Sequence, residues 1–161
     1  MKNLKTKPID ILLVEDNEGD ILLTQSAFQE AKIANTIHVA KDGEKALAFL
    51  NQEGEYADVP RPDIILLDIN LPKIDGTQVL EKLKNDPLLK LIPVVVLTSS
   101  KAERDIVKSY KLHANSYIVK PVNFDDFKKI IDVIENFWFT VVAYPTDDEI
   151  KDILNDKTDK E

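Results

Sequence analysis

The chain alternates short apolar runs with longer amphipathic stretches, and it does so five times. The apolar runs are rich in leucine and β-branched residues, a composition typical of strands, and they cover residues 9–14, 36–40, 63–68, 93–98 and 116–120. Because these runs are apolar almost throughout, we expect both faces of each strand to be buried. Strict strand–helix alternation predicts one α/β domain, in which helices cover both faces of a parallel sheet.

The last amphipathic stretch begins at Asn123, a good N-cap, and has Asp125 and Asp126 in its first turn, where the helix dipole favours acids. Its end is unusually apolar. There are more apolar side chains here than the end of a solvated helix needs, so we expect some of them to form an exposed patch. The apolar residues are Phe137, Trp138, Phe139, Val141, Val142 and Tyr144.

Length and composition narrow the class of protein. A chain of 161 residues is long enough for one domain with a proper core. It contains no cysteine, which excludes disulfides and cysteine-ligated zinc and fits a reducing cytoplasm. No apolar run approaches the roughly 20 residues of a membrane span, and the basic N-terminus lacks the apolar region of a signal peptide. We therefore expect a cytoplasmic protein that does not enter a membrane.

The net charge is −8, and it is unevenly distributed. Residues 146–161 hold seven acids and three lysines, which is about half of the excess, so an acidic tail is expected from residue 145. Nucleic-acid binders usually present a basic face to phosphates. The charge thus argues against binding of DNA or RNA by this chain.

Polar residues follow the apolar runs at the points where the predicted strands end. The set comprises Glu15, Asp16, Asp68, Thr98, Ser99 and Lys120. Parallel strands end at one edge of their sheet, and the sites of such sheets lie beyond that edge. We expect these side chains to converge on one pocket.

The residue types in this pocket favour phosphoryl chemistry. Three neighbouring carboxylates repel one another, which favours protonation or recruitment of a cation. Without a His or Cys cluster, a hard, oxygen-seeking ion such as Mg²⁺ fits best. A lysine and a hydroxyl can hold phosphoryl oxygens. The set therefore suits in-line attack of a carboxylate on phosphorus, with an aspartyl phosphate as product.

Four short motifs occur in order: Ile-Leu-Leu-Val-Glu-Asp-Asn with Glu15 and Asp16, Leu-Leu-Asp-Ile-Asn-Leu-Pro with Asp68, Leu-Thr-Ser at 97–99, and Tyr-Ile-Val-Lys-Pro at 117–121. Asp68 precedes Thr98 by 30 residues and Lys120 by 52. Together, from Ile9 to Phe139, they resemble the receiver domain of two-component response regulators. The resemblance implies a flavodoxin-like (CheY-like) fold with five parallel strands in the order 2-1-3-4-5. The expected boundaries are a lead-in at 1–8, a receiver at 9–144 and a tail at 145–161.

The resemblance also implies a role for each acid of the pocket. Asp68 would accept a phosphoryl group from a histidine kinase. Asp16 would ligate Mg²⁺ directly, Glu15 would do so through water, and Asn70 would contribute its main-chain carbonyl. Glu15 stands where the family more often has aspartate, so the metal geometry may be expected to differ slightly.

Other residues would act as the switch. Thr98, with Ser99 beside it, would contact the phosphoryl group, Tyr117 would swing inward behind Thr98, and Lys120 would pair with the phosphate. Lys120-Pro121 would be a cis peptide, which requires a proline. Such a protein is a phosphoacceptor in signalling rather than an enzyme that turns over a substrate, although it catalyses its own phosphotransfer and dephosphorylation.

Two features resemble the single-domain regulators that partner bacterial phytochromes: a long loop at 51–62 and the aromatic ending. This implies a phytochrome as the kinase. It also implies a homodimer formed by the last helix and the aromatic ending, with Phe137, Trp138, Phe139, Val141 and Tyr144 in the interface. Another departure from the family is His113, where a glycine is usual.

Two other functions fit parts of the pattern. An interaction module that is never phosphorylated, a pseudo-receiver, would share the fold, but such proteins usually lose acids that this chain keeps. A small Mg²⁺-dependent aspartyl phosphohydrolase would place its nucleophile after the first strand and would need a cap, and neither feature is found. At single positions, Glu15-Asp16 as a solvated turn and Thr98-Ser99 as a helix cap remain the plain structural alternatives.

Overall fold

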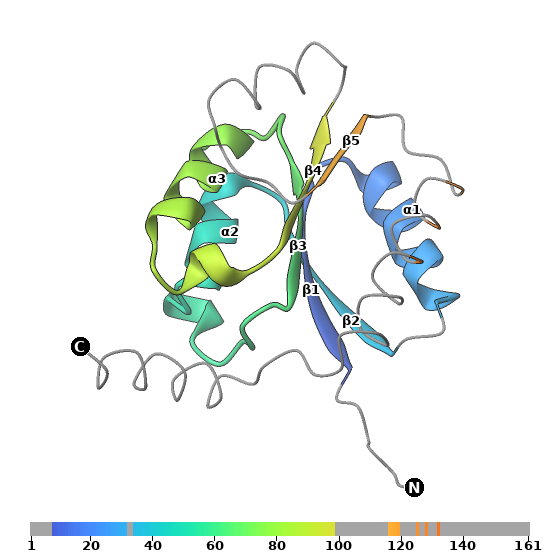
Figure 1. Ribbon diagram of the computed structural model, residues 1–161, viewed down its shortest axis with the longest axis horizontal. Helices are drawn as coiled ribbons and strands as arrows, with labels where there is room; N and C mark the ends of the chain where they lie inside the picture. The colour runs from blue at the N-terminus through green and yellow to red at the C-terminus, as the bar shows by residue number, and fades with distance from the viewer. Residues whose placement is uncertain are drawn as a thin grey trace, which may run out of the picture. The chain divides into compact units, whose positions relative to one another are not determined.

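The computed structural model describes residues 8–31, 34–98 and 116–119, together with the single positions Asp125, Lys128 and Asp132 (Figure 1). The amphipathic stretch between the fourth and fifth apolar runs, where a helix is expected, and the acidic tail lie outside these residues. The chain divides into two compact units at residue 128. The strands and helices described here belong to the first unit, and the domain boundary at residue 144 stays a prediction.

The sheet has the predicted topology. Its five parallel strands are β1 (Ile9–Val14), β2 (Asn35–Ala40), β3 (Ile64–Asp68), β4 (Val94–Thr98) and β5 (Ser116–Val119). They lie in the order β2-β1-β3-β4-β5, so the predicted flavodoxin-like order 2-1-3-4-5 is confirmed. All residues of β1, β3 and β4 are buried, as burial on both faces requires.

Helices cover the two faces of the sheet. The helix α1 (Glu18–Gln29) lies on one face, whereas α2 (Gly43–Leu50) and α3 (Gly76–Asn85) lie on the other (Figure 1). Two short 3₁₀ helices, η1 (Gly54–Tyr56) and η2 (Leu89–Leu91), complete the described elements. The predicted loop at 51–62 thus contains one short helical turn.

The core on the α2 and α3 side is continuous. It combines alternate residues of the central strands with the inward faces of both helices, including Leu12, Leu67, Val96, Phe49 and Leu80. Fully burying one such side chain stabilises the fold by about 1.5–3 kcal/mol. This packing holds β1, β3 and β4 rigidly side by side, so the residues at their carboxyl ends are fixed in relation to each other.

Side-chain caps begin each helix close to the carboxyl edge of the sheet. Asn17 Oδ1 accepts a hydrogen bond from Asp20 N–H, and Asp42 Oδ1 accepts one from Lys45 N–H. Asp75 forms a capping box at the start of α3. The caps fix the residue at which each helix begins. They therefore place three helix N-termini near the edge of the sheet where the predicted site lies.

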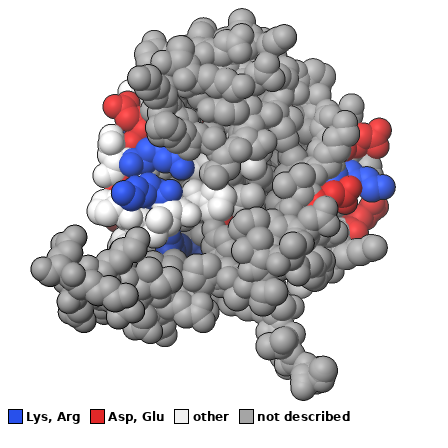
Figure 2. Space-filling model, in the orientation of Figure 1, with Lys and Arg blue, Asp and Glu red and all other residues white. Residues whose placement is uncertain are grey.

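The described side chains visible on the face shown in Figure 2 are mixed in charge. Acidic and basic groups lie near each other at both sides of this view. Lys41, for example, pairs with Glu18 at the start of α1. On α1, Ile21 is buried, whereas the next residue, Leu22, is 62% exposed. No helix among the described residues is long and apolar enough to cross a bilayer.

Candidate functional site

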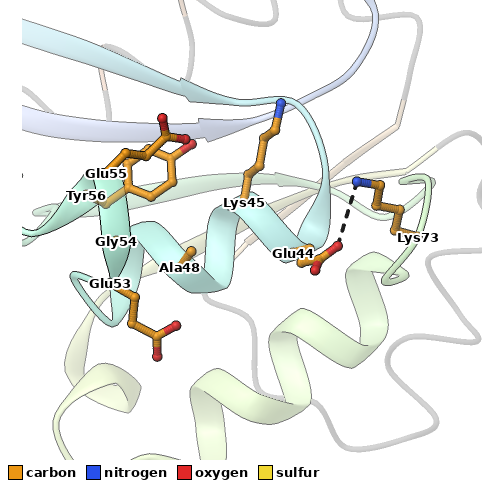
Figure 3. A pocket seen from close by; sticks show the side chains of 8 residues that line it. All are labelled: Glu44, Lys45, Ala48, Glu53, Gly54, Glu55, Tyr56 and Lys73. Atoms are coloured by element: carbon orange, nitrogen blue, oxygen red, sulfur yellow. Dashed lines mark ion pairs between the residues drawn. The ribbon is translucent and has the colours of Figure 1, made fainter.

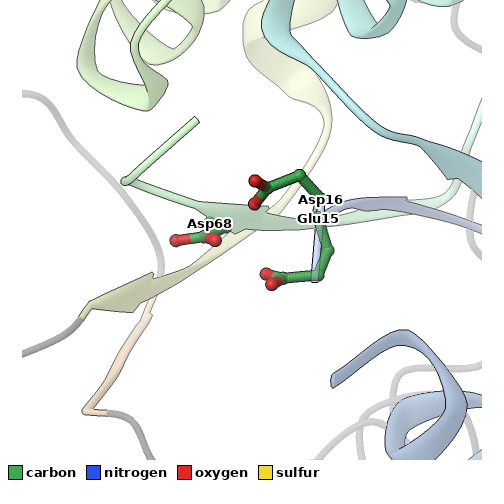
Figure 4. A group of neighbouring side chains, drawn as sticks. All are labelled: Glu15, Asp16 and Asp68. Carbon is green, nitrogen blue, oxygen red and sulfur yellow. The ribbon is translucent and has the colours of Figure 1, made fainter. Parts of the chain in front are cut away.

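Three carboxylates meet at the carboxyl edge of the sheet. Glu15 and Asp16 follow β1 directly, and Asp68 is the last residue of β3. Because β1 pairs with β3 in a register that sets Val14 against Leu67, these acids end at the same level. One carboxylate oxygen from each of the three lies within 4.8 Å of the other two, and Figure 4 shows the side chains of Glu15 and Asp16 extending toward Asp68.

Two of these acids are buried. Glu15 is 1% exposed and Asp68 is 3% exposed, whereas Asp16 faces solvent. The main chain orients both buried groups: Asn17 N–H donates to Glu15 Oε1 at 3.3 Å, and Asn70 N–H donates to Asp68 Oδ1 at 2.9 Å. Burial of like charges at this separation is costly, so the cluster is suited to binding a cation.

The donor set fits a hard divalent cation. All three side chains offer only carboxylate oxygens as ligands, and carboxylate oxygens suit Mg²⁺ and Mn²⁺. The exposed position of Asp16 leaves the cluster open to solvent on one side. Glu15, Asp16 and Asp68 are therefore the residues that could hold such an ion, and the structure brings together these three predicted ligands.

The predicted switch residues are described only in part. Thr98 ends β4, is fully buried, and lies next to the end of β3, because Asp68 pairs with Leu97. The backbone of Tyr117 belongs to β5, opposite Val96. Ser99, Lys120, Pro121 and the side chain of Tyr117 lie outside the described residues. So do Phe137, Trp138, Phe139, Val141 and Tyr144.

The segment between Asp68 and α3 is closed at its base. Gly76 N–H donates to the carbonyl oxygen of Ile69 at 3.1 Å. A Cβ on Gly76 would lie 2.5 Å from the carbonyl oxygen of Asp68 and 2.5 Å from Ile69 Cα, which are backbone atoms that cannot move aside cheaply. Glycine is thus required here, and the start of α3 rests on the main chain of Asp68.

Lys73, in the middle of that segment, was not singled out by the sequence. Its φ is +66°, a left-handed conformation that costs a non-glycine residue about 1 kcal/mol. Its Nζ lies 3.7 Å from Asp42 Oδ2. It also lies 3.7 Å from Glu44 Oε2, and Figure 3 shows this second ion pair. The ion pairs tie the segment after Asp68 to the start of α2. The turn sequence Lys-Ile-Asp-Gly at 73–76 was the one available signal.

An open groove of about 470 Å³ lies beside this ion pair, between α2 and η1. Most of its lining is charged, and Glu44, Lys45, Glu53, Glu55 and Lys73 supply these groups (Figure 3). Burial, followed by the neighbouring Glu55 carboxylate, raises the pKa of the phenol at the groove wall, Tyr56. The groove is open and its charged side chains are exposed to solvent, so the triad at the sheet edge, with two buried carboxylates, is the stronger candidate site.

The fold and the acidic edge define a phosphoacceptor signalling domain, and the comparisons with known proteins agree. Residues 11–132 match the model of the response regulator receiver domain. This match covers more than half of the chain, and the chain belongs to the response-regulator receiver family. The predicted family is therefore confirmed.

Individual relatives are similar over almost their whole length. Response regulator Rcp1 from Synechocystis sp. is 46% identical over 145 residues, which cover 90% of this chain and 99% of the relative. The structure of the phosphorylated cyanobacterial phytochrome response regulator RcpA is 48% identical, covers 87% of this chain and 100% of its own, and has a TM-score of 0.75. The Mn²⁺-bound form of Rcp1 is 47% identical, with coverages of 86% and 100% and a TM-score of 0.74.

These similarities show the kind of function. The chain is a phosphoacceptor response regulator related to phytochrome response regulators. A divalent-metal site is in keeping with the Mn²⁺-bound relative and with the acidic cluster of this structure.

Proposed function

We propose that Asp68 accepts a phosphoryl group from the phosphohistidine of a histidine kinase, with Mg²⁺ bound beside it. One observation carries the proposal: three carboxylate oxygens, two of them from buried residues, lie within 4.8 Å of one another at the carboxyl edge of the sheet. Without a bound cation, repulsion among these carboxylates would lower the stability of the fold. A bound cation would offset this repulsion and leave a preformed site for a phosphoryl group.

Each residue has a distinct part in the reaction. A carboxylate oxygen of Asp68 forms a bond to phosphorus as the phosphorus–nitrogen bond of the donor breaks, and the histidine nitrogen keeps the electron pair and takes up a proton. Asn70 N–H holds the Asp68 carboxylate in place. Glu15, Asp16 and the main-chain carbonyl of Asn70 hold the metal with Asp68. Bound Mg²⁺ supplies charge neutralisation for the transferred group.

The signal would pass from the acyl phosphate to the switch residues. Thr98, buried at the end of β4, is in reach of the edge where Asp68 lies, and its hydroxyl would donate to a phosphoryl oxygen. Lys120 would pair with the phosphate, and Ser99, Tyr117 and Pro121 would follow. The added charge would shift a two-state equilibrium and change partner binding, or the group would be relayed onward.

The proposed kinase is a phytochrome. This is supported by a similar solved structure, which is described as the phosphorylated cyanobacterial phytochrome response regulator RcpA. The absence of cysteine from the sequence fits a cytoplasmic location for such a pair. Phosphotransfer from a purified phytochrome kinase to this chain, followed by intact mass, would test the pairing, and transfer only from unrelated kinases would end it.

We also propose a homodimer, based on the apolar ending of the chain. The interface would contain Phe137, Trp138, Phe139, Val141 and Tyr144. Gel filtration coupled to light scattering would show a dimer that Trp138→Ala weakens. A monomeric wild type would exclude the dimer.

The phosphoacceptor itself is tested by intact mass after incubation with acetyl phosphate and Mg²⁺. We expect a gain of one phosphoryl group in the wild type, no gain with EDTA, and no gain in Asp68→Asn. Asp58→Asn is the matched control, because Asp58 is an exposed aspartate outside the triad, and it should gain the group normally. A wild type that never gains mass would contradict the proposal and point to an interaction module that is not phosphorylated.

A further inference from the structure

Lys73 occupies a backbone conformation that suits glycine better than lysine. Its φ of +66° lies in the left-handed region, which glycine adopts without a steric penalty. Gln52 is the other non-glycine residue of the described chain with a positive φ, and it lies at the end of α2, away from the segment that follows Asp68. A side chain kept at an unfavourable φ requires contacts that compensate for it.

The compensating contacts are ionic. Lys73 Nζ lies 3.7 Å from Asp42 Oδ2 and 3.7 Å from Glu44 Oε2, as Figure 3 shows for Glu44. Asp42 is a rigid anchor, because it is 6% exposed and its other oxygen, Oδ1, caps α2 by accepting Lys45 N–H at 2.7 Å. Lys73 therefore links the segment after Asp68 to a fixed point on the neighbouring helix.

A close backbone contact strengthens the same link. A Cβ on Gly43, the first residue of α2, would lie 2.2 Å from the carbonyl oxygen of Ile74. Only glycine lets the segment come this near to α2. Both residues of the Lys73–Ile74 peptide therefore contact the start of α2. Lys73 does so through its ion pairs, and Ile74 does so through its carbonyl oxygen, which lies close to Gly43.

The segment matters because it carries Asn70. The N–H of Asn70 binds Asp68 Oδ1 at 2.9 Å, and Lys73 follows three residues later. The hydrogen bond between Gly76 N–H and the carbonyl oxygen of Ile69 closes the base of the segment, so Asn70 and Lys73 lie within one short closed loop.

We propose that Lys73 is a positioning residue for the metal: its ion pairs to Asp42 and Glu44 hold the segment in the conformation that presents the Asn70 carbonyl to the acidic cluster. This inference rests on the proposed function, in which that carbonyl is a ligand. Lys73 itself touches neither metal nor phosphate. Its side chain is 60% exposed, so its attraction to the two acids is modest and is screened by salt.

The test compares three variants in Mg²⁺ titrations by calorimetry. Lys73→Met removes the charge and keeps the length of the side chain and the cost of the positive φ. Lys73→Arg keeps the charge. Lys45→Met is the matched control, because Lys45 lines the same groove, is exposed, and changes the net charge by the same amount.

We expect Lys73→Met to raise the Kd for Mg²⁺ about threefold over Lys45→Met at low ionic strength, and Lys73→Arg to restore wild-type binding. The difference should vanish near 1 M NaCl, where the Debye length is only ~3 Å. In the metal-free protein, amides of residues 69–75 should exchange with deuterium faster in Lys73→Met than in Lys45→Met. This second measurement reports on the segment alone.

Equal Kd values for Lys73→Met and Lys45→Met at low salt would overturn the inference, as would a threefold difference that persists in high salt. If the wild type still gains a phosphoryl group on Asp68 in that case, the proposed function stands and only the role of Lys73 is lost. A wild type that binds no Mg²⁺ and gains no phosphoryl group would remove both.

Discussion

Both ends of the sheet carry buried acids, but the groups that surround these acids differ between the two ends. At the amino end, Asp10 Oδ1 lies 3.0 Å from His38 Nε2, and Asp63 Oδ2 accepts Asp10 N–H at 2.8 Å. At the carboxyl end, Glu15 and Asp68 also accept main-chain N–H groups, but the carboxylates of Glu15, Asp16 and Asp68 lie against one another. Hydrogen bonds to an acid stabilise a fold, whereas repulsion among neighbouring acids opposes it until a cation binds. The first end is built for stability and the second for ligand binding.

The largest change in stability is expected when an acid is removed from the amino end. Asp10→Ala should lower the free energy of unfolding by about 2 kcal/mol, because it removes the partner of His38 from a buried position. Urea unfolding at neutral pH would measure it, with Asp58→Ala as the exposed control. Equal losses in the two variants would show that the amino-end pair contributes nothing of its own.

The opposite sign is expected at the carboxyl end. In EDTA, Asp16→Asn should raise the free energy of unfolding by up to about 1 kcal/mol, because it removes one of three mutually repelling charges, the solvent-exposed one. Thermal unfolding would measure the change. Saturating Mg²⁺ should reverse the order, since the wild type binds the ion better and gains more by mass action. A destabilised Asp16→Asn in EDTA would break the contrast between the ends.

The smallest effect concerns pH, at the amino end again. Asp86, which follows α3, accepts N–H groups of Leu89 and Leu88, and these bonds lower the pKa of its carboxyl below the ordinary value. A carboxyl with a lowered folded-state pKa stabilises the fold above its unfolded pKa of about 4, and that stability is lost as the pH falls through the folded value.

Asp86→Asn should therefore be less stable than the wild type near neutral pH, by under about 1 kcal/mol, and the gap should narrow as the pH falls below the ordinary carboxyl pKa of about 4. Urea unfolding at several pH values would follow the gap, with Asp58→Asn as the control for general charge effects. A gap that stays constant with pH would show that the hydrogen bonds, and not the charge, account for the difference.

Much of the fold could be predicted, because its signals are local. The bounds of β1 follow from an apolar run that only Asp10 interrupts, and the predicted start of the strand that ends at Asp68 differs from the observed start by one residue. The convergence of Glu15, Asp16 and Asp68 also followed from sequence, since parallel strands place their carboxyl ends at one edge.

What the sequence did not reveal depends on register and on closely packed backbone. Asp10 and His38 are 28 residues apart and meet only because β1 pairs with β2 with Asp10 opposite Thr36, which sets His38 two positions further along the same face. The positive φ of Lys73 was hidden for a different reason. Lysine does not mark such a turn as glycine would, and the acids that hold it lie on another helix.

The pairing of β1 with β3 also has a consequence for newly made chains. Asp16 and Asp68 are 52 residues apart in the sequence, and β2 and α2 lie between them. Glu15 and Asp16 are therefore synthesised well before Asp68. A slip of one residue in this pairing would turn the side chains of β1 to the opposite faces of the sheet. The acidic cluster therefore forms only in copies whose central strands have already paired in register. A copy that contains all three acids but has not yet paired these strands lacks the cluster.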